Sequence, residues 1–168
     1  NFYKINNLNN IAMNYQLDEI DKKILDFLVE NTRMPFTEIA KQMDVSAGTI
    51  HVRVKKMEDA GIILGSSLNI DYGKLDYHFT AFIGILLTKS NRTQEVLKEL
   101  ASIPNVVEAS VISGKYNIFC KVRAKHTEDA KRIIYQIDDI QDVMRTESMI
   151  SMEEYLSDRN RLINAISI

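Results

Sequence analysis

The sequence predicts an α+β protein with two parts, a domain of three short helices followed by a domain built on an antiparallel sheet. Two observations lead to this fold class. Between residues 17 and 60, apolar residues recur at steps of three and four, which is the spacing of amphipathic helices. After residue 77, strand-like and helical segments alternate in the order β-α-β-β-α-β, the ferredoxin-like arrangement with both helices on one face of the sheet. A chain of 168 residues can hold two such small domains.

The first residues of the chain, 1–14, are rich in asparagine and lack any periodicity. We expect this segment to be a disordered arm or upstream sequence, with Met13 as a plausible start, and we exclude it from the fold. The first predicted domain therefore spans residues 15–64.

This first domain has the spacing of a helix-turn-helix. Its first helix begins after Asp18, a residue type that caps helix N-termini, and ends at an Asn-Thr-Arg-Met-Pro stretch. A second helix is expected over 37–43, followed by a tight turn at Asp44. Ser46 caps the third helix, and Gly61 ends it.

The third helix is apolar on one face and largely polar and basic on the other. At 100° per residue, the apolar face consists of Ile50, Val54 and Met57. The opposite face carries Thr49, Val52, Arg53 and Lys56. No acidic residue occurs between Ser46 and Met57, although the domain as a whole is slightly acidic. A short turn followed by a helix that is basic on its outer side is typical of a helix laid in the major groove of double-stranded DNA.

The alternative is that this face is simply the solvated side of an amphipathic helix. The three-helix spacing, the short turn and the lack of acidic residues favour DNA binding instead. In this interpretation Ser46 and Thr49 hydrogen-bond phosphate or base edges. Arg53 reads guanine or holds a phosphate, and Lys56 neutralises a second phosphate.

The second predicted domain spans residues 77–152, after an extended linker at 65–76 and before a tail at 153–168. Its predicted strands are 79–87, 106–113, 116–122 and 143–152, and its predicted helices are 93–101 and one capped by Thr127. The first strand is apolar on both sides, with Phe82 and Leu86 opposite the core-facing residues. Because two helices cover only one face of the sheet, the other apolar face predicts a homodimer.

The first domain resembles the DNA-binding domain of the Lrp/AsnC (feast/famine) transcriptional regulators, nearest to the AsnC branch. The resemblance rests on Leu-Asp-Glu-Ile-Asp from Leu17, Thr-Glu-Ile-Ala from Thr37, and Ser-x-x-Thr-Ile-x-x-Arg-Val-x-x-Met-Glu-x-x-Gly-Ile-Ile from Ser46. It implies a winged-type helix-turn-helix that binds a specific DNA sequence. The family often has glycine where this chain has Asp44 and Asp76. With Thr37 added by the resemblance, the predicted DNA-contact residues are Thr37, Ser46, Gly48, Thr49, Val52, Arg53 and Lys56.

The second domain resembles the RAM domain of the same family, which senses amino acids at contacts between dimers. Two runs carry this resemblance, Ser-Gly-Lys-Tyr-Asn from Ser113 and Arg-Thr-Glu-Ser from Arg145. They imply a small amino-acid effector and a homodimer that assembles into tetramers or octamers. The candidate effector-binding residues are Gly114, Tyr116, Asn117, Thr146 and Ser148. Two alternatives remain for this loop: a plain hairpin turn in which glycine supplies a positive φ, and a vestigial pocket.

The composition argues against several other functions. A net charge of -2 gives no overall attraction to DNA or membranes, so DNA binding has to rest on a local patch. Cys120 is the only cysteine and the three histidines are scattered, so we expect no disulfide, metal or cofactor. The chain has no membrane-length apolar stretch, and the expected location is the cytoplasm. A ferredoxin-like dimeric enzyme and a protein-interaction module without DNA binding are the alternatives; no paired catalytic groups support the enzyme.

Overall fold

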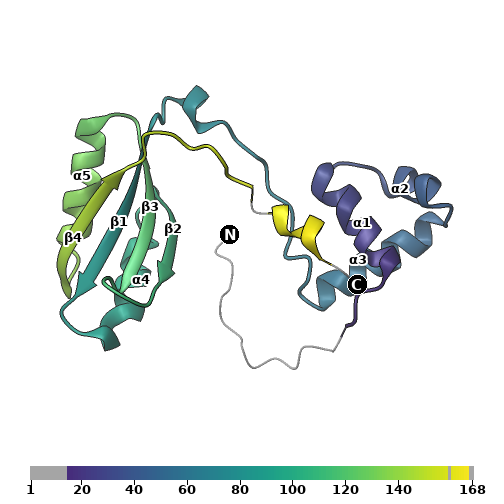
Figure 1. Cartoon of the computed structure of the whole chain (residues 1–168), viewed down its shortest axis with the longest axis horizontal. Helices are drawn as coiled ribbons and strands as arrows, with labels where there is room; N and C mark the ends of the chain where they lie inside the picture. The colour runs from purple at the N-terminus through teal and green to yellow at the C-terminus, as the bar shows by residue number, and fades with distance from the viewer. Residues whose placement is uncertain (1–14, 159, 167–168) are drawn as a thin grey trace. The chain divides into compact units, whose positions relative to one another are not determined.

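The computed structural model describes residues 15–158 and 160–166, without the side chain of residue 164. The prediction for residues 1–14 lies outside the described part of the chain. The described chain divides into two compact units (Figure 1). One unit ends at Leu68 and also includes the segment from Ser157 onward, and the other unit spans Asn69–Leu156.

The first unit consists of α1 (Glu19–Glu30), α2 (Phe36–Met43) and α3 (Ala47–Asp59). Asp18 caps α1 by accepting hydrogen bonds from the N–H groups of Ile20 and Asp21, and the Asp21 side chain accepts from the Asp18 N–H. This reciprocal pair satisfies three backbone donors that a helix start leaves without partners. Asp44 ends α2 with φ 55°, the left-handed conformation that the tight turn between α2 and α3 requires.

One apolar cluster holds the three helices together. Its fully buried members are Ile24, Ile39, Ile50 and Met57. Ile163, in the short 3-10 helix Arg161–Ala165, also packs against this cluster, although the sequence did not place the tail. Between α3 and the first strand the described residues contain no strand, so the single chain forms no wing.

The second unit contains β1 (Phe79–Leu87), α4 (Thr93–Leu100), β2 (Val106–Val111), β3 (Ile118–Ala124), α5 (Thr127–Asp138) and β4 (Val143–Ile150). All neighbouring strands are antiparallel, in the order β2-β3-β1-β4. The predicted β-α-β-β-α-β order is therefore confirmed. One detail is wrong: His126, rather than Thr127, caps α5, because its Nδ1 accepts the Asp129 N–H at 3.2 Å.

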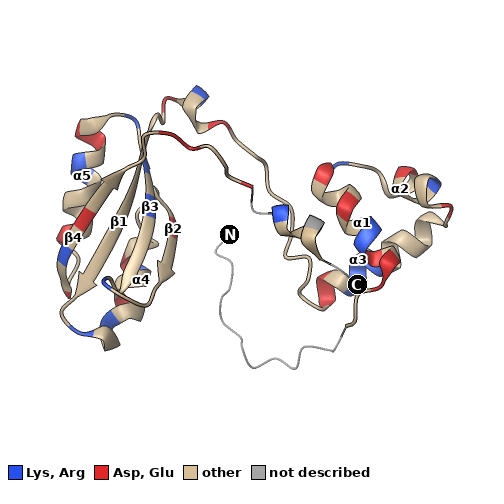
Figure 2. Ribbon diagram, viewed as in Figure 1, with Lys and Arg blue, Asp and Glu red and all other residues tan. Residues whose placement is uncertain are grey.

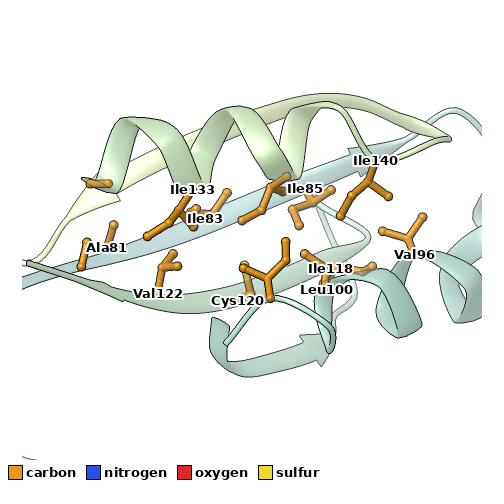
Figure 3. Packing of buried hydrophobic residues seen from close by; sticks show 14 of the residues in the cluster. Ala81, Ile83, Ile85, Val96, Leu100, Ile118, Cys120, Val122, Ile133 and Ile140 are labelled. Carbon is orange, nitrogen blue, oxygen red and sulfur yellow. The ribbon is translucent and has the colours of Figure 1, made fainter. Parts of the chain in front are cut away.

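Both helices cover the same face of the sheet (Figure 1). The buried side chains of β1 and β3 meet those of α4 and α5 in a single core (Figure 3). Its labelled members are Ala81, Ile83, Ile85, Val96, Leu100, Ile118, Cys120, Val122, Ile133 and Ile140. Since strand residues alternate between faces, the neighbours of these residues along each strand lie on the uncovered face.

The uncovered face carries aromatic side chains at its centre. The rings of Phe82 in β1 and Phe119 in β3 stack with centroids 5.9 Å apart. Lys121 and Arg123, farther along β3, both pair with Glu154 of the segment that follows β4. The predicted mixture of apolar residues on both faces of β1 is confirmed, with Phe82 and Leu86 half-buried on the uncovered side.

Candidate functional site

The outward face of α3 lines a groove of about 530 Å³ beside the start of α1. Five of the predicted DNA-contact residues border this groove: Gly48, Thr49, Val52, Arg53 and Lys56. Val52 is 51% exposed, while Ile50 and Met57, on the other side of the same helix, are fully buried. The groove also includes Tyr15 and Gln16, which the sequence did not single out because they precede the first periodic segment.

The start of α3 is held by hydroxyl groups. Ser46 Oγ accepts the Thr49 N–H at 3.0 Å and lies 2.8 Å from Thr49 Oγ1. Thr49 Oγ1 keeps a free lone pair whichever hydroxyl donates, because an alcohol oxygen can accept twice and Thr49 Oγ1 accepts at most once here. Gly48 is exposed, with only Ser46 Oγ within 4 Å of a Cβ built on it. Thr37 is exposed in the first turn of α2.

The sequence led us to expect that the Arg53 side chain extends freely away from α3. In the structure it does not. Its Nη1 donates to Asp18 Oδ2 at 2.7 Å and to Asp21 Oδ1 at 2.9 Å. The Arg53 side chain is 25% exposed, and the Asp21 side chain is only 1% exposed. The pKa of Asp18 lies below its ordinary value because backbone N–H groups and the Arg53 guanidinium stabilise the carboxylate.

The other basic residues of α3 differ in their surroundings. Lys55 pairs with Asp59 one turn later at 2.7 Å, and both are exposed. Lys56 is exposed on the groove and has no ion pair among the described residues. Figure 2 shows acidic and basic residues intermixed over the three helices. The positive potential that DNA needs is therefore confined to a small part of the unit.

The loop between β2 and β3 holds three of the predicted effector residues. The Ile112 N–H donates to the Asn117 carbonyl at 3.1 Å, and Gly114 has φ 117°, a conformation that favours glycine. Asn117 is tied to β1: its side-chain oxygen accepts the Leu87 N–H at 2.9 Å, and its own N–H donates to Ile85. The Asn117 side chain therefore has a structural role in addition to any contact with an effector.

Tyr116 lies flat on the uncovered face of the sheet. Its ring lies over Gly84, where an added Cβ would come within 2.7 Å of three ring atoms. Its hydroxyl donates to Glu147 Oε2 at 2.5 Å, and Lys115 Nζ approaches the same oxygen at 2.6 Å. Hydrogen bonds from Lys115 and Tyr116 lower the pKa of Glu147 below its ordinary value. Glu147 was not among the predicted site residues, although side chains alternate between the two faces of a strand and this alternation places Glu147 opposite Thr146.

Thr146 and Ser148 lie on the other face of the sheet from Glu147. The register pairs Thr146 with Ile85 and Ser148 with Ile83, both of which point into the core. Thr146 donates to Asp138 of α5 at 2.6 Å. Within one chain, the five predicted effector residues therefore do not surround one pocket. Their role in binding stays a prediction.

The single cysteine is part of the hydrophobic core. Cys120 is buried there, and burial raises the pKa of its thiol to about 12. Among residues 15–158 and 160–166, no group of three or more His, Cys, Asp or Glu side chains is arranged to hold a metal ion. No helix in the same ranges is both long enough and apolar enough to cross a membrane.

Comparison with known proteins assigns both units. Residues 17–58 match the AsnC-type helix-turn-helix domain, and residues 80–161 match the Lrp/AsnC ligand binding domain. The regulatory protein AsnC of Haemophilus influenzae is 41% identical over 140 residues, which cover 83% of this chain and 93% of that protein. The Escherichia coli K12 AsnC protein is 38% identical over 141 residues, with the same shares of each chain covered.

Solved structures agree. The E. coli AsnC structure superimposes with a TM-score of 0.80 at 36% identity, covering 85% of this chain and 97% of that one. A Neisseria meningitidis regulator, solved as a complex with L-Met, has a TM-score of 0.81 at 19% identity and covers 86% of this chain and 96% of its own; it supports the fold alone. These relatives are regulators, so the enzyme alternative is not favoured. With both domains matched and a relative 41% identical along 93% of its length, the chain belongs to the Lrp/AsnC family of transcriptional regulators.

Proposed function

We propose that this regulator binds a specific double-stranded DNA site by laying α3 in the major groove. The observation that carries this proposal is the division of α3 into a buried face and an exposed face. Ile50 and Met57 are 0% exposed, whereas Val52 is 51% exposed and borders an open groove. The residues proposed to lie at the DNA surface are Thr37, Ser46, Gly48, Thr49, Val52, Arg53 and Lys56.

The test is DNA binding at graded salt. A duplex selected by the protein from a random pool is titrated by fluorescence anisotropy between 50 and 200 mM salt. Affinity should fall steeply, because phosphate contacts release counterions. Lys56→Ala should weaken binding, whereas Lys23→Ala should not, since Lys23 is exposed on α1 and does not border the groove. Equal effects of the two variants, or salt-independent binding, would contradict the assignment of the α3 face.

We also propose that two chains associate through the uncovered face of the sheet, and that such homodimers assemble into tetramers or octamers. Phe82 and Phe119 stack in the middle of this face, and Met149 next to them is 42% exposed. Sheet faces that meet water normally carry polar residues at these positions. Light scattering should give at least a dimer mass. A Phe82→Lys variant should shift it toward the monomer, because a charge would be buried in the interface.

The second unit is proposed to bind a free amino acid at the loop formed by residues 112–117. The unit matches a ligand binding domain, and a regulator with the same fold was solved with L-Met. Gly114 has backbone groups exposed in this loop, Tyr116 supplies an aromatic ring, and Lys115 and Glu147 supply opposite charges. Thr146 and Ser148 would serve a ligand on the helix-covered side of β4.

A thermal-shift screen over the amino acids, with light scattering on the same samples, tests this proposal. One amino acid or a small group should raise the melting temperature, because a ligand that binds only the folded state stabilises it. Gly114→Asp should remove that shift while DNA binding persists. Lys74→Ala, an exposed change outside the loop, serves as the control. If no amino acid raises the melting temperature of the parent chain, the proposal is wrong and the loop is a plain hairpin turn.

The proposed functional parts are a DNA-binding domain at residues 15–64, a linker at 65–76, a ligand-sensing domain at 77–152 and a tail at 153–168. Packing of Ile163 against the first unit supports a role for the tail in that unit. We place the protein in the cytoplasm because its proposed partner is DNA. A reporter fusion followed by cell fractionation tests this location.

A further inference from the structure

The side chain of Arg53 joins two helices of the DNA-binding unit. It leaves α3 and donates from Nη1 to Asp18 and Asp21, at 2.7 and 2.9 Å. Both acceptors lie at the start of α1, 35 and 32 residues earlier in the chain. Asp18 is the N-cap of α1, and Asp21 is the third residue of the helix. The contact therefore links the middle of α3 to a fixed point on α1.

Asp21 makes this link strong. Its side chain is 1% exposed, and its carboxylate accepts hydrogen bonds from three described residues. Oδ1 faces Arg53, while Oδ2 accepts from the Tyr15 hydroxyl at 2.9 Å and from the Asp18 N–H at 3.2 Å. Arg53 is the cation among these donors. A buried carboxylate that loses its cation is left with an uncompensated charge, so Arg53 is held in place by the cost of leaving.

The same contact changes the charge that α3 presents to DNA. Two carboxylates surround one guanidinium, and the Asp18 side chain is 51% exposed on the same groove. A phosphate brought to Arg53 would meet a cluster with net negative charge. Lys56 has no such neighbour in an ion pair within the described residues. The attraction for phosphate on this face is therefore expected from Lys56, with the Thr49 hydroxyl and the exposed start of α3.

We infer that Arg53 is a positioning residue, which sets the direction of α3 on α1 through Asp18 and Asp21, while Thr49, Val52 and Lys56 contact the DNA. This inference rests on the proposed binding of DNA by α3. The competing role is direct contact, since Arg53 retains Nε–H and Nη2–H groups beyond the two bonds of Nη1. The two roles differ in what they predict for salt dependence and specificity.

The experiment uses the full chain with two duplexes, one selected from a random pool by the parent protein and one scrambled. Arg53→Gln removes the charge but keeps an amide donor for Asp21, and Lys56→Ala is the control that removes one phosphate contact. Loss of a phosphate contact lowers the salt slope by about 1 and weakens both duplexes alike. For Arg53→Gln we expect an unchanged slope and a ratio of selected to scrambled affinity about tenfold lower than that of the parent chain. A slope lowered as in Lys56→Ala would overturn the inference.

Asp18→Asn keeps the inference testable if Arg53→Gln does not fold, because asparagine caps helices as well as aspartate does. Removal of the exposed Asp18 charge should favour phosphate on both duplexes whichever role Arg53 has, so the readout is the ratio of selected to scrambled affinity. Direct contact by Arg53 predicts an equal or higher ratio, because Arg53 loses a competing carboxylate. A positioning role predicts a lower ratio. The double variant Asp18→Asn with Arg53→Gln should be no weaker than Arg53→Gln alone. Failure of the parent chain to bind any duplex would instead overturn the proposed function.

Discussion

Gly84 is the position where one added methyl group has a defined consequence. A Cβ built on Gly84 lies 2.7 Å from three atoms of the Tyr116 ring, well inside van der Waals contact. The ring cannot move away without cost, because its hydroxyl bonds Glu147 at 2.5 Å and its face lies near Phe119. Gly84→Ala should therefore lower the free energy of unfolding by about 1–3 kcal/mol, the usual cost of overpacking. It should also displace Tyr116 from Glu147.

Native-state hydrogen exchange of amides in β1 and β3 measures the stability of the second unit separately from the helical unit. The decisive comparison is Gly84→Ala in a Tyr116→Ala background. With the ring gone, the nearest obstacle is gone as well, and alanine is better than glycine in a strand by about 0.5–1 kcal/mol. The cost of Gly84→Ala should then vanish or change sign. The same cost in both backgrounds would refute the steric explanation.

Three further predictions concern other parts of the chain. Because burial raises the Cys120 pKa to about 12, iodoacetamide should label it only after unfolding by urea; fast labelling of the native chain would contradict its burial. Asp76 has φ 66°, so Asp76→Gly should stabilise the second unit or leave it unchanged, whereas Asp76→Val should destabilise it, as measured by urea unfolding. The lowered pKa of Asp18 means that its carboxylate contributes stability above its ordinary pKa of 3.8, and this contribution is lost as the pH falls through the lower folded value. Acid melts of Asp18→Asn should lack this part of the pH dependence.

The elements of the fold were largely predictable from local pattern. The strand β1 begins and ends where predicted, because its apolar run is long and polar residues flank it. The predicted strand at 116–122 is displaced to Ile118–Ala124, since Asn117 is used to close the loop and to bind β1. Such a shift depends on a contact with a residue thirty positions away, which the local pattern does not contain.

Side-chain placement at the candidate sites was less predictable. Helical periodicity gives the direction in which the Cα–Cβ bond of Arg53 points, but a long side chain can fold back onto a distant partner. The partners Asp18 and Asp21 were read only as helix-capping residues. In β4, by contrast, strict alternation places Glu147 on the opposite face from Thr146 and Ser148, so this separation was predictable from the sequence alone.

The charge balance of the helical unit limits how strongly one unit alone can bind DNA. Residues 15–64 contain seven basic and nine acidic residues, and on α3 both Arg53 and Lys55 are paired with carboxylates. A single helical unit therefore has little positive charge with which to hold DNA. Two units joined by the sheet domain add their contacts, since the second binds at the high effective concentration that the first creates. If two chains associate through the sheet as proposed, affinity for DNA depends on how the sheet domains assemble, and a ligand that changes this assembly would change DNA binding without touching α3.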